Sequence, residues 1–394
     1  MDQMTQIPPA GIRPGILRLD DSRIREVAHF GMKLGGVVPL WFGEPDEPTP
    51  DFICEAAAEA LRQGHTFYTE SAGVPELRDA LAEYLTPLCG RPISSDRIVI
   101  TASGMNAIQI IMQSLVDAGT NVVTTSPLWP NCAETVRIMG GEVRPVLLSM
   151  GNDGWQLDIE RLMDSCDADT RALFINSPNN PTGWVMPRDQ QQALLDFARE
   201  KGIWIIADEV YDRMVFEGTR APSFLDIAGE DDPVLVLNSF SKSWSMTGWR
   251  MGWITAPPGM IPTLLKMNEF NTASAATFAQ HAGVVAVKQG EPFIARSVAR
   301  YKQGRDLVFD RLSQHPRVRI VQPKGAFYHF FAVDGMTDSL DFTKRLVAEH
   351  RVGLAPGSAF GPGGEGHLRL CFANSSEILN HCLDRIETML DTAR

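Results

Sequence analysis

The chain lacks the sequence features of a membrane or secreted protein. No uninterrupted apolar run approaches the ~18 residues of a membrane-spanning helix. The start, Met1–Gln6, has neither the basic patch nor the apolar core of a secretory signal. The six cysteines are scattered without a Cys-x-x-Cys pair, which indicates reduced core thiols. We therefore expect a cytoplasmic protein.

Metal centres and nucleic-acid binding are also disfavoured. The eight histidines are dispersed and no metal-ligand spacing occurs, so no metal is expected. The net charge of −12, from 36 basic and 48 acidic residues, disfavours nucleic acid or an anionic membrane as a partner, because both attract basic surfaces. The chain has neither internal repeats nor low-complexity tracts. A chain of 394 residues is too long to fold around one small hydrophobic core. We therefore predict a large domain plus a smaller one.

From Arg97 to about Pro257, short apolar strands alternate with amphipathic helices. Because these strands are apolar on both faces, they indicate a mostly parallel sheet covered by helices on both sides. The predicted strands are 98–100, 122–124, 143–148, 171–175, 203–206 and 234–237, and the predicted helices are 106–116 closed by Gly119, 133–139, and 189–201 stopped by Gly202.

The two ends of the chain have different patterns. The first ~40 residues include Pro8, Pro9 and Pro14 and are predicted to form an irregular arm rather than a core element. After about residue 290, a long charged helix (295–312) precedes short strands at 318–320, 327–330 and 367–371, which is typical of a smaller α+β domain. The predicted division is an N-terminal arm with part of the small domain in 1–50, a large domain in 51–290 and the small domain in 291–394.

Polar residues follow four of the predicted strands. They are Ser103-Gly104, the segment 176–183, Asp208 and the segment 239–242. In such sheets, ligands bind beyond the carboxyl ends of the strands. We therefore expect these residues to share one site.

The strongest chemical signal is the segment Ser239–Arg250, SFSKSWSMTGWR. Lys242 lies just past a buried strand, and Arg250 adds a fixed positive charge eight residues later. A lysine amine forms a Schiff base with a carbonyl, and a guanidinium grips a phosphate with two hydrogen bonds. An aldehyde that carries a phosphate needs both groups, which points to pyridoxal phosphate (PLP). Most Lys and Arg are surface charges, so this interpretation depends on the motifs that accompany the segment.

Two such motifs precede it, Asn176–Gly183 (NSPNNPTG) and Ala207–Tyr211 (ADEVY). With all three in this order, the chain resembles the fold-type I PLP enzymes, specifically the class I/II aminotransferases of the aspartate aminotransferase-like superfamily. The resemblance extends from Gly43 to Arg369, nearly the whole chain. It implies an α/β fold with a mostly parallel mixed sheet flanked by helices, plus a smaller α+β domain.

The resemblance implies a transaminase of amino acid metabolism. Such an enzyme transfers an amino group between an L-amino acid and a 2-oxo acid through a Schiff base on Lys242, which also carries the substrate Cα proton. Asp208, costly to bury without a partner, would keep the pyridine nitrogen of PLP protonated. Tyr211 would donate to the phenolate oxygen of PLP. Asn180 would contact that oxygen and the substrate carboxylate, in a turn where a cis Asn–Pro bond is plausible.

The phosphate of PLP is expected at a helix N-terminus. Backbone N–H groups after Ser103 would bind it, and Gly104 would let it approach the backbone closely. Met105 can give only its backbone N–H, where the family commonly has a hydroxyl or small residue. Ser239 and Arg250 would complete the phosphate-binding site.

Four further residues are assigned by the resemblance. Trp129 would stack over the pyridine ring beside the substrate. Tyr68 would reach the phosphate across a dimer interface, which implies a homodimer with shared sites. Arg369 would bind the substrate α-carboxylate with its fork of donors, and Gly43 would let the backbone approach the same carboxylate. The simpler alternatives are a core aromatic for Trp129 and a strand-end salt bridge for Arg369.

Two other functions stay open at this point. A lyase, synthase or decarboxylase on the same fold would also need Lys242, Asp208 and Arg250. A regulatory protein that senses PLP is more remote, because only ~40 residues precede the first motif, too few for a DNA-binding domain. The sequence does not identify the amino acid or the 2-oxo acid, although Ser22 and Arg23 lie in an arm that relatives fold over the pocket.

Overall fold

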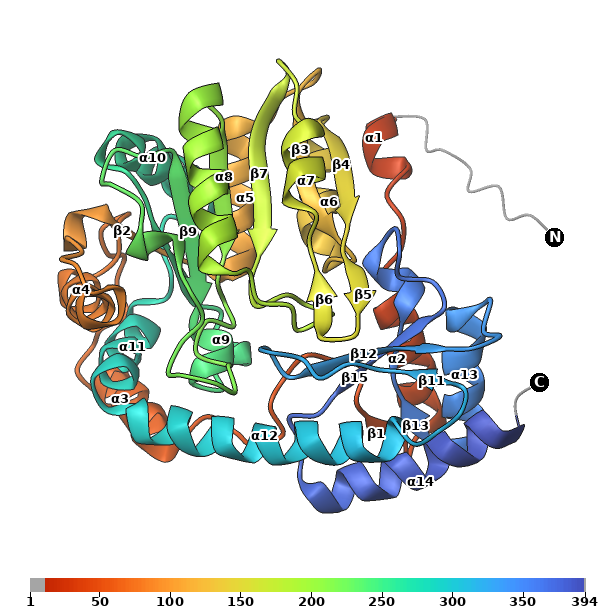
Figure 1. The fold of residues 1–394 in the computed structure, drawn as a ribbon. Helices are drawn as coiled ribbons and strands as arrows, with labels where there is room; N and C mark the ends of the chain where they lie inside the picture. The colour runs from red at the N-terminus through yellow and green to blue at the C-terminus, as the bar shows by residue number, and fades with distance from the viewer. Residues whose placement is uncertain (1–10, 393–394) are drawn as a thin grey trace.

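The computed structural model describes residues 11–392, which form two main sheets connected by a long helix, α12 (Figure 1). The larger sheet has the strand order β2-β10-β9-β8-β7-β3-β4. Strand β10 runs antiparallel to both neighbours, and the other adjacent pairs run parallel, which confirms the predicted mixed, mostly parallel sheet. Its strands are β2 (Ile98–Thr101), β3 (Asn121–Ser126), β4 (Glu142–Leu147), β7 (Thr170–Asn176), β8 (Trp204–Asp208), β9 (Val234–Ser239) and β10 (Gly252–Thr255).

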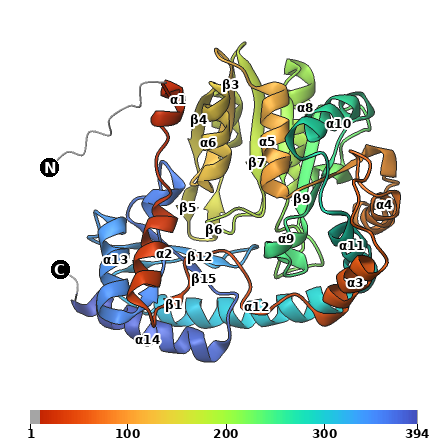
Figure 2. The same ribbon diagram turned by 180° about the vertical axis from the view of Figure 1, so that it is seen from behind.

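Helices cover both faces of this sheet because its strands are apolar on both faces. In β8, Ile206 packs into one apolar cluster, while Ile205 and Ala207 pack into the other, as the alternation of a strand requires. The first cluster includes side chains of α5, α6 and α10 (Figure 2), and the second includes side chains of α4, α8 and α11. The helices of this part are α3 (Asp51–Arg62), α4 (Pro75–Cys89), α5 (Gly104–Leu115), α6 (Pro130–Met139), α7 (Ile159–Asp164), α8 (Arg188–Lys201), α9 (Phe240–Ser243), α10 (Ile261–Thr272) and α11 (Thr277–Gln289).

The smaller sheet is antiparallel, with the order β11-β12-β15-β14. Its strands are β11 (Val318–Arg319), β12 (Tyr328–Val333), β14 (Ala355–Pro356) and β15 (His367–Cys371). The helices beside it are α12 (Glu291–Leu312), α13 (Ser339–His350) and α14 (Ser376–Thr392). The two remaining pairs are β1 (Val38–Pro39) with β13 (Val352–Gly353), and β5 (Ser149–Gly151) with β6 (Gly154–Gln156). Five short 3-10 helices are Ser95–Arg97, Phe224–Asp226, Thr247–Trp249, Pro258–Met260 and Gly357–Phe360.

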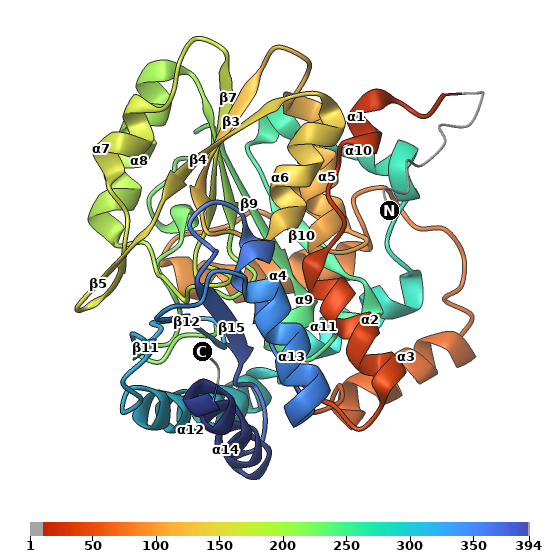
Figure 3. The same cartoon turned by 90° about the vertical axis from the view of Figure 1, so that its right-hand side faces the viewer.

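The prediction of an irregular N-terminal arm is wrong for much of that segment. A short helix, α1 (Pro14–Leu17), precedes α2 (Arg23–Leu34), which packs against α13 (Figure 3). The buried residues of α2 are Ile24, Val27, Ala28 and Gly31. The prolines and glycines that suggested an arm lie before α2, and their composition masked the helical spacing that follows. Pro8 and Pro9 lie outside the described residues.

Two other expectations about boundaries have different outcomes. Gly119 does not close the helix after β2, because α5 ends at Leu115 and Val116 already adopts extended backbone angles. The division of the chain into 1–50, 51–290 and 291–394 stays a prediction, and α3 and α12 begin at its two boundaries. Within residues 11–392, no helix combines the length and the apolar character that crossing a membrane requires.

The topology gathers several connections at one edge of the larger sheet. Strands β2, β3, β7, β8 and β9 point the same way, so their carboxyl ends meet there, beside β12 and β15 of the smaller sheet (Figure 1). This edge carries the segments that follow each strand, and they contain most of the predicted site residues.

Candidate active site

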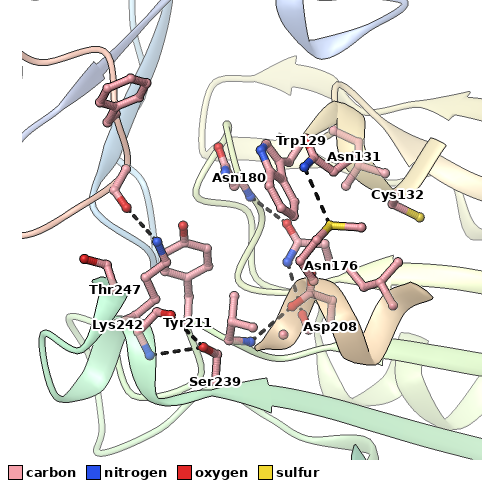
Figure 4. A pocket seen from close by; sticks show the side chains of 18 of the residues that line it. Trp129, Asn131, Cys132, Asn176, Asn180, Asp208, Tyr211, Ser239, Lys242 and Thr247 are labelled. Atoms are coloured by element: carbon pink, nitrogen blue, oxygen red, sulfur yellow. Dashed lines mark hydrogen bonds between the residues drawn. The ribbon is translucent and has the colours of Figure 1, made fainter. Parts of the chain in front are cut away.

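A cavity of about 300 Å³ lies at this edge, walled by residues of both sheets and of α2. Its volume is within the range of small-molecule sites. Figure 4 shows Lys242, Tyr211 and Ser239 on one side and Asp208, Asn176 and Trp129 on the other. The predicted site residues that line the cavity are Gly43, Gly104, Met105, Trp129, Asn180, Asp208, Tyr211, Ser239, Lys242, Arg250 and Arg369.

Lys242 is held at the cavity wall by α9, the single helical turn that follows β9. Its Nζ donates a hydrogen bond to the Gly43 carbonyl oxygen at 2.6 Å and lies 5.5 Å from the centre of the Tyr211 ring. Burial, the largest cause, lowers the pKa of Lys242 to about 8, and the positive charge of Arg369 acts in the same direction. A larger fraction of the amine is therefore neutral near physiological pH, as a nucleophile requires.

Asp208 ends β8 and is buried. Its Oδ1 accepts a hydrogen bond from the Val210 backbone N–H at 3.3 Å. Burial raises the pKa of Asp208 to about 7, while that hydrogen bond and the charge of Lys242 oppose the rise. A carboxyl held this way gains from a cationic partner in the cavity, because an opposite charge restores its ionised form. The protonated ring nitrogen of PLP is such a partner.

One part of the cavity wall suits a phosphate. Backbone N–H groups of α5 begin at Gly104, and the exposed Arg250 donates from Nη1 to the Thr247 carbonyl at 2.5 Å. A Cβ at Gly104 would lie 3.4 Å from the Ser239 Cβ, an ordinary contact, so packing of the protein itself does not require glycine there. Closeness to a ligand is the remaining reason for glycine at this position.

Two predicted residues do not line the cavity of the single chain. Ser103 is buried, and its hydroxyl accepts a hydrogen bond from the Asn106 N–H at 3.0 Å as the N-cap of α5. This cap orders the first turn of α5, whose backbone N–H groups are the ones expected to bind the phosphate. Tyr68 is 94% exposed and lies outside the cavity wall.

Arg369 lies on β15, buried at the far wall of the cavity. Its Nη1 donates to Asn180 Oδ1 at 2.8 Å, and its Nη2 donates to the Trp41 carbonyl oxygen. Its Nε is buried and has no hydrogen-bond partner among the described residues. An unpaired buried donor is costly, and the fork still has free N–H groups. A carboxylate in the cavity would satisfy them.

The turn that carries Asn180 is fixed by backbone contacts. The Asn180–Pro181 peptide bond is cis, as the sequence suggested. The Asn180 N–H donates to Asn176 Oδ1 at 2.8 Å, and the Trp129 N–H donates to the Asn180 carbonyl at 2.9 Å. The segments after β3 and β7 are thereby connected at the cavity.

Sequence reasoning missed several cavity residues. The additional lining residues include Arg25, Phe42, Asn131, Cys132, Ser241, Thr247 and Tyr328. Ser22 and Arg25 line the cavity, whereas Arg23 does not, because residues three apart share one face of a helix. That periodicity was available in the sequence, but the helix was not recognised. Tyr328 gave no signal, because it begins an apolar strand that resembles core.

Comparison with known proteins shows the family of this chain. The family described as aminotransferase class I and II matches residues 36–386. An aspartate aminotransferase of Pyrococcus horikoshii is 34% identical, over 95% of this chain and 96% of the relative. Aromatic-amino-acid aminotransferase 2 of Thermococcus litoralis is also 34% identical, over 94% and 96%.

Solved structures give the same result. The crystal structure of the aspartate aminotransferase of Thermotoga maritima has a TM-score of 0.90 and 34% identity, covering 97% of this chain and 100% of that one. The large mixed sheet, the smaller sheet and the cavity between them therefore form the fold-type I architecture. The chain belongs to the class I and II aminotransferases and is a PLP-dependent transaminase, transferring an amino group between an amino acid and a 2-oxo acid.

Proposed function

We propose that Lys242 is the catalytic lysine of this transaminase, with Asp208 and Tyr211 as the other catalytic residues. The observation that supports this most is the position of the Lys242 amine in one cavity with the buried carboxyl of Asp208 and with Arg250 and Arg369. PLP, when bound, supplies an aldehyde carbon for the amino group and a ring that withdraws electrons from the substrate. The test is replacement of Lys242 by alanine, measured as transaminase turnover.

The other residues bind and orient. Asp208 would keep the proton on the ring nitrogen of PLP, and Tyr211 would donate to its phenolate oxygen. Gly104, Met105, Ser239 and Arg250 hold the phosphate, and Ser103 contributes as the cap that orders the start of α5.

The substrate lies between the cofactor and the smaller sheet. Arg369 grips its α-carboxylate together with Asn180, beside Gly43 and Trp129. Lys242 would be the group that carries the Cα proton of an amino acid held in this way.

The part of the cavity that α2 lines determines which substrate side chains bind. Ser22, Ile24 and Arg25 line it, and no side-chain hydrogen bond or ion pair of Arg25 occurs within residues 11–392. Two of the similar relatives are named aspartate aminotransferases, and a third is named an aromatic-amino-acid aminotransferase. We infer that Arg25 favours an amino donor with a second carboxylate, such as aspartate.

Arg25→Gln should reduce the ratio of kcat/KM for aspartate to kcat/KM for phenylalanine by about tenfold, the effect of losing one charge-assisted hydrogen bond. Steady-state kinetics with both donors measures the ratio. Arg23→Gln is the matched control, because Arg23 lies outside the cavity wall and should leave the ratio unchanged. An unchanged ratio in Arg25→Gln would exclude the proposed role of Arg25.

We also propose a homodimer in which Tyr68 reaches the phosphate site of the partner. Phe67, Tyr68 and Phe270 have exposed fractions of 82%, 94% and 79%, an unusual exposure for aromatic side chains. Phe67 and Tyr68 are consecutive residues, and Thr277 Oγ1 at the start of α11 donates to the Phe67 carbonyl. Such a patch is typical of an interface between copies of a chain.

The dimer predicts complementation between two variants. Tyr68→Phe should weaken PLP binding about tenfold or more, through loss of one hydrogen bond to a charged group. A hybrid dimer of Tyr68→Phe with Lys242→Ala should regain one site of native PLP affinity, because one site receives both intact residues. Titration of the co-expressed hybrid, with its mass checked by sedimentation, measures this. A monomer, or a hybrid without a native site, would contradict the proposal.

We propose a cytoplasmic location for this enzyme. The six cysteines are all free thiols in the structure, as in proteins of reducing compartments. Recovery of the enzyme in a secreted or membrane fraction would contradict it.

A further inference from the structure

Tyr328 begins β12, is fully buried and contributes to the cavity wall. Its hydroxyl oxygen lies 2.6 Å from the hydroxyl oxygen of Tyr211, so one phenol donates to the other. Burial raises the pKa of both tyrosines above the usual value, so both are protonated at neutral pH. A protonated pair has one O–H left to donate elsewhere.

The ring of Tyr328 is fixed by the residue that is proposed to bind the substrate. The Arg369 guanidinium carbon lies 4.4 Å from the centre of the Tyr328 ring, within the range of a cation–π contact. Strand pairing adds rigidity, because β12 and β15 are hydrogen-bonded neighbours with Tyr328 opposite Cys371. The orientation of Tyr328 is therefore coupled to that of Arg369.

Gly43 makes room for the Tyr328 hydroxyl. A Cβ at Gly43 would lie 1.7 Å from that oxygen, so no other residue fits there without moving Tyr328. The Gly43 carbonyl also accepts the hydrogen bond of Lys242. The hydroxyl of Tyr328 therefore lies beside Gly43 and the Tyr211 hydroxyl, next to the residue whose carbonyl oxygen holds the Lys242 amine.

We propose that Tyr328 is a positioning residue, whose hydroxyl donates to Tyr211 and directs the Tyr211 proton toward the phenolate oxygen of PLP. The inference rests on the role proposed above for Tyr211. A phenol that accepts a hydrogen bond becomes a stronger donor itself, so Tyr328 increases the stabilisation that Tyr211 gives to a negative oxygen. The other ionisable groups that act on Tyr328 are Arg369, Cys371 and Glu44, from β15 and the loop after β1.

Tyr328→Phe removes only the hydroxyl and keeps the ring under Arg369. In the holoenzyme, the absorbance of lysine-bound PLP titrates with pH, and weaker stabilisation of its anionic oxygen should raise that pKa. We expect a rise of about half a unit to one unit in Tyr328→Phe, and a larger rise in Tyr211→Phe. The double variant should match Tyr211→Phe alone, because Tyr328 acts through Tyr211.

Tyr301→Phe is the matched control. Tyr301 is equally buried and packs edge-on against Phe327, but it does not line the cavity, so its loss should leave the pKa unchanged. An unchanged pKa in Tyr328→Phe, or additive shifts in the double variant, would overturn the proposed role of Tyr328. An unchanged pKa in Tyr211→Phe would instead overturn the role of Tyr211, which separates the two failures.

Discussion

Lys242→Ala should lower transaminase turnover by about 10⁴-fold, at the upper end of what a positioned acid or base contributes. The substitution removes the amine that is proposed both to attach the cofactor and to carry the Cα proton. Water in the vacated space lacks the basicity of an amine whose pKa is about 8. Turnover of purified protein, with PLP in excess and a panel of amino donors, measures the loss.

Lys201→Ala is the control for Lys242→Ala. Lys201 ends α8 on the surface and pairs with Glu200, so its loss should leave turnover unchanged. Circular dichroism should show both variants folded, because Lys242 makes one side-chain hydrogen bond in the protein. Turnover in Lys242→Ala above a tenth of the native value would rule out the catalytic role.

Arg369→Leu should lower kcat/KM for every amino donor by roughly 10³-fold, since removing one member of a buried charge pair costs about 2–5 kcal/mol. The loss should be similar for acidic and aromatic donors, because Arg369 is proposed to bind the α-carboxylate that all donors share. The absorbance of bound PLP should persist, since the phosphate residues are untouched. Kinetics with two donors and a spectrum of the holoenzyme measure both.

Arg369→Lys provides the matched comparison. Lysine keeps the charge but loses the planar fork that also contacts Asn180 and the Trp41 carbonyl, so an intermediate loss is expected. The contacts of Arg369 join β15 to two loops, so their loss also affects stability. A melting curve of each variant measures that effect separately from the kinetics. A kcat/KM within fivefold of native in Arg369→Leu would show that another residue binds the carboxylate.

The sequence predicted the larger sheet well because its strands are buried on both faces. Short apolar runs such as those of β8 and β9 are typical of buried parallel strands. The polar residue that ends each run marks the edge of the sheet where ligands bind. Lys242, Asp208 and Arg250 could be chosen before the fold was known, because each belongs to a segment with a distinct chemical pattern. The structure then placed them in one cavity.

What the sequence could not provide depends on contacts between distant segments. The hydroxyl of Tyr328 meets Tyr211 from 117 residues away, and nothing in the strand that carries it distinguishes it from core. Ser103 was predicted to begin the phosphate site through the backbone N–H groups that follow it, and the side-chain cap that it gives to α5 became visible only in the structure. The helix α2, which lines part of the cavity, was not predicted because the prolines and glycines before it suggested an irregular arm.

The central claim is that the amine after β9 attaches the cofactor covalently. Borohydride reduction of the holoenzyme, followed by digestion and mass spectrometry, tests it most directly. A reduced pyridoxyl group on the peptide that contains Lys242, and its absence from the same peptide of Lys242→Ala, is the predicted result. An adduct on a different lysine, or none on any peptide, would contradict the assignment of this site.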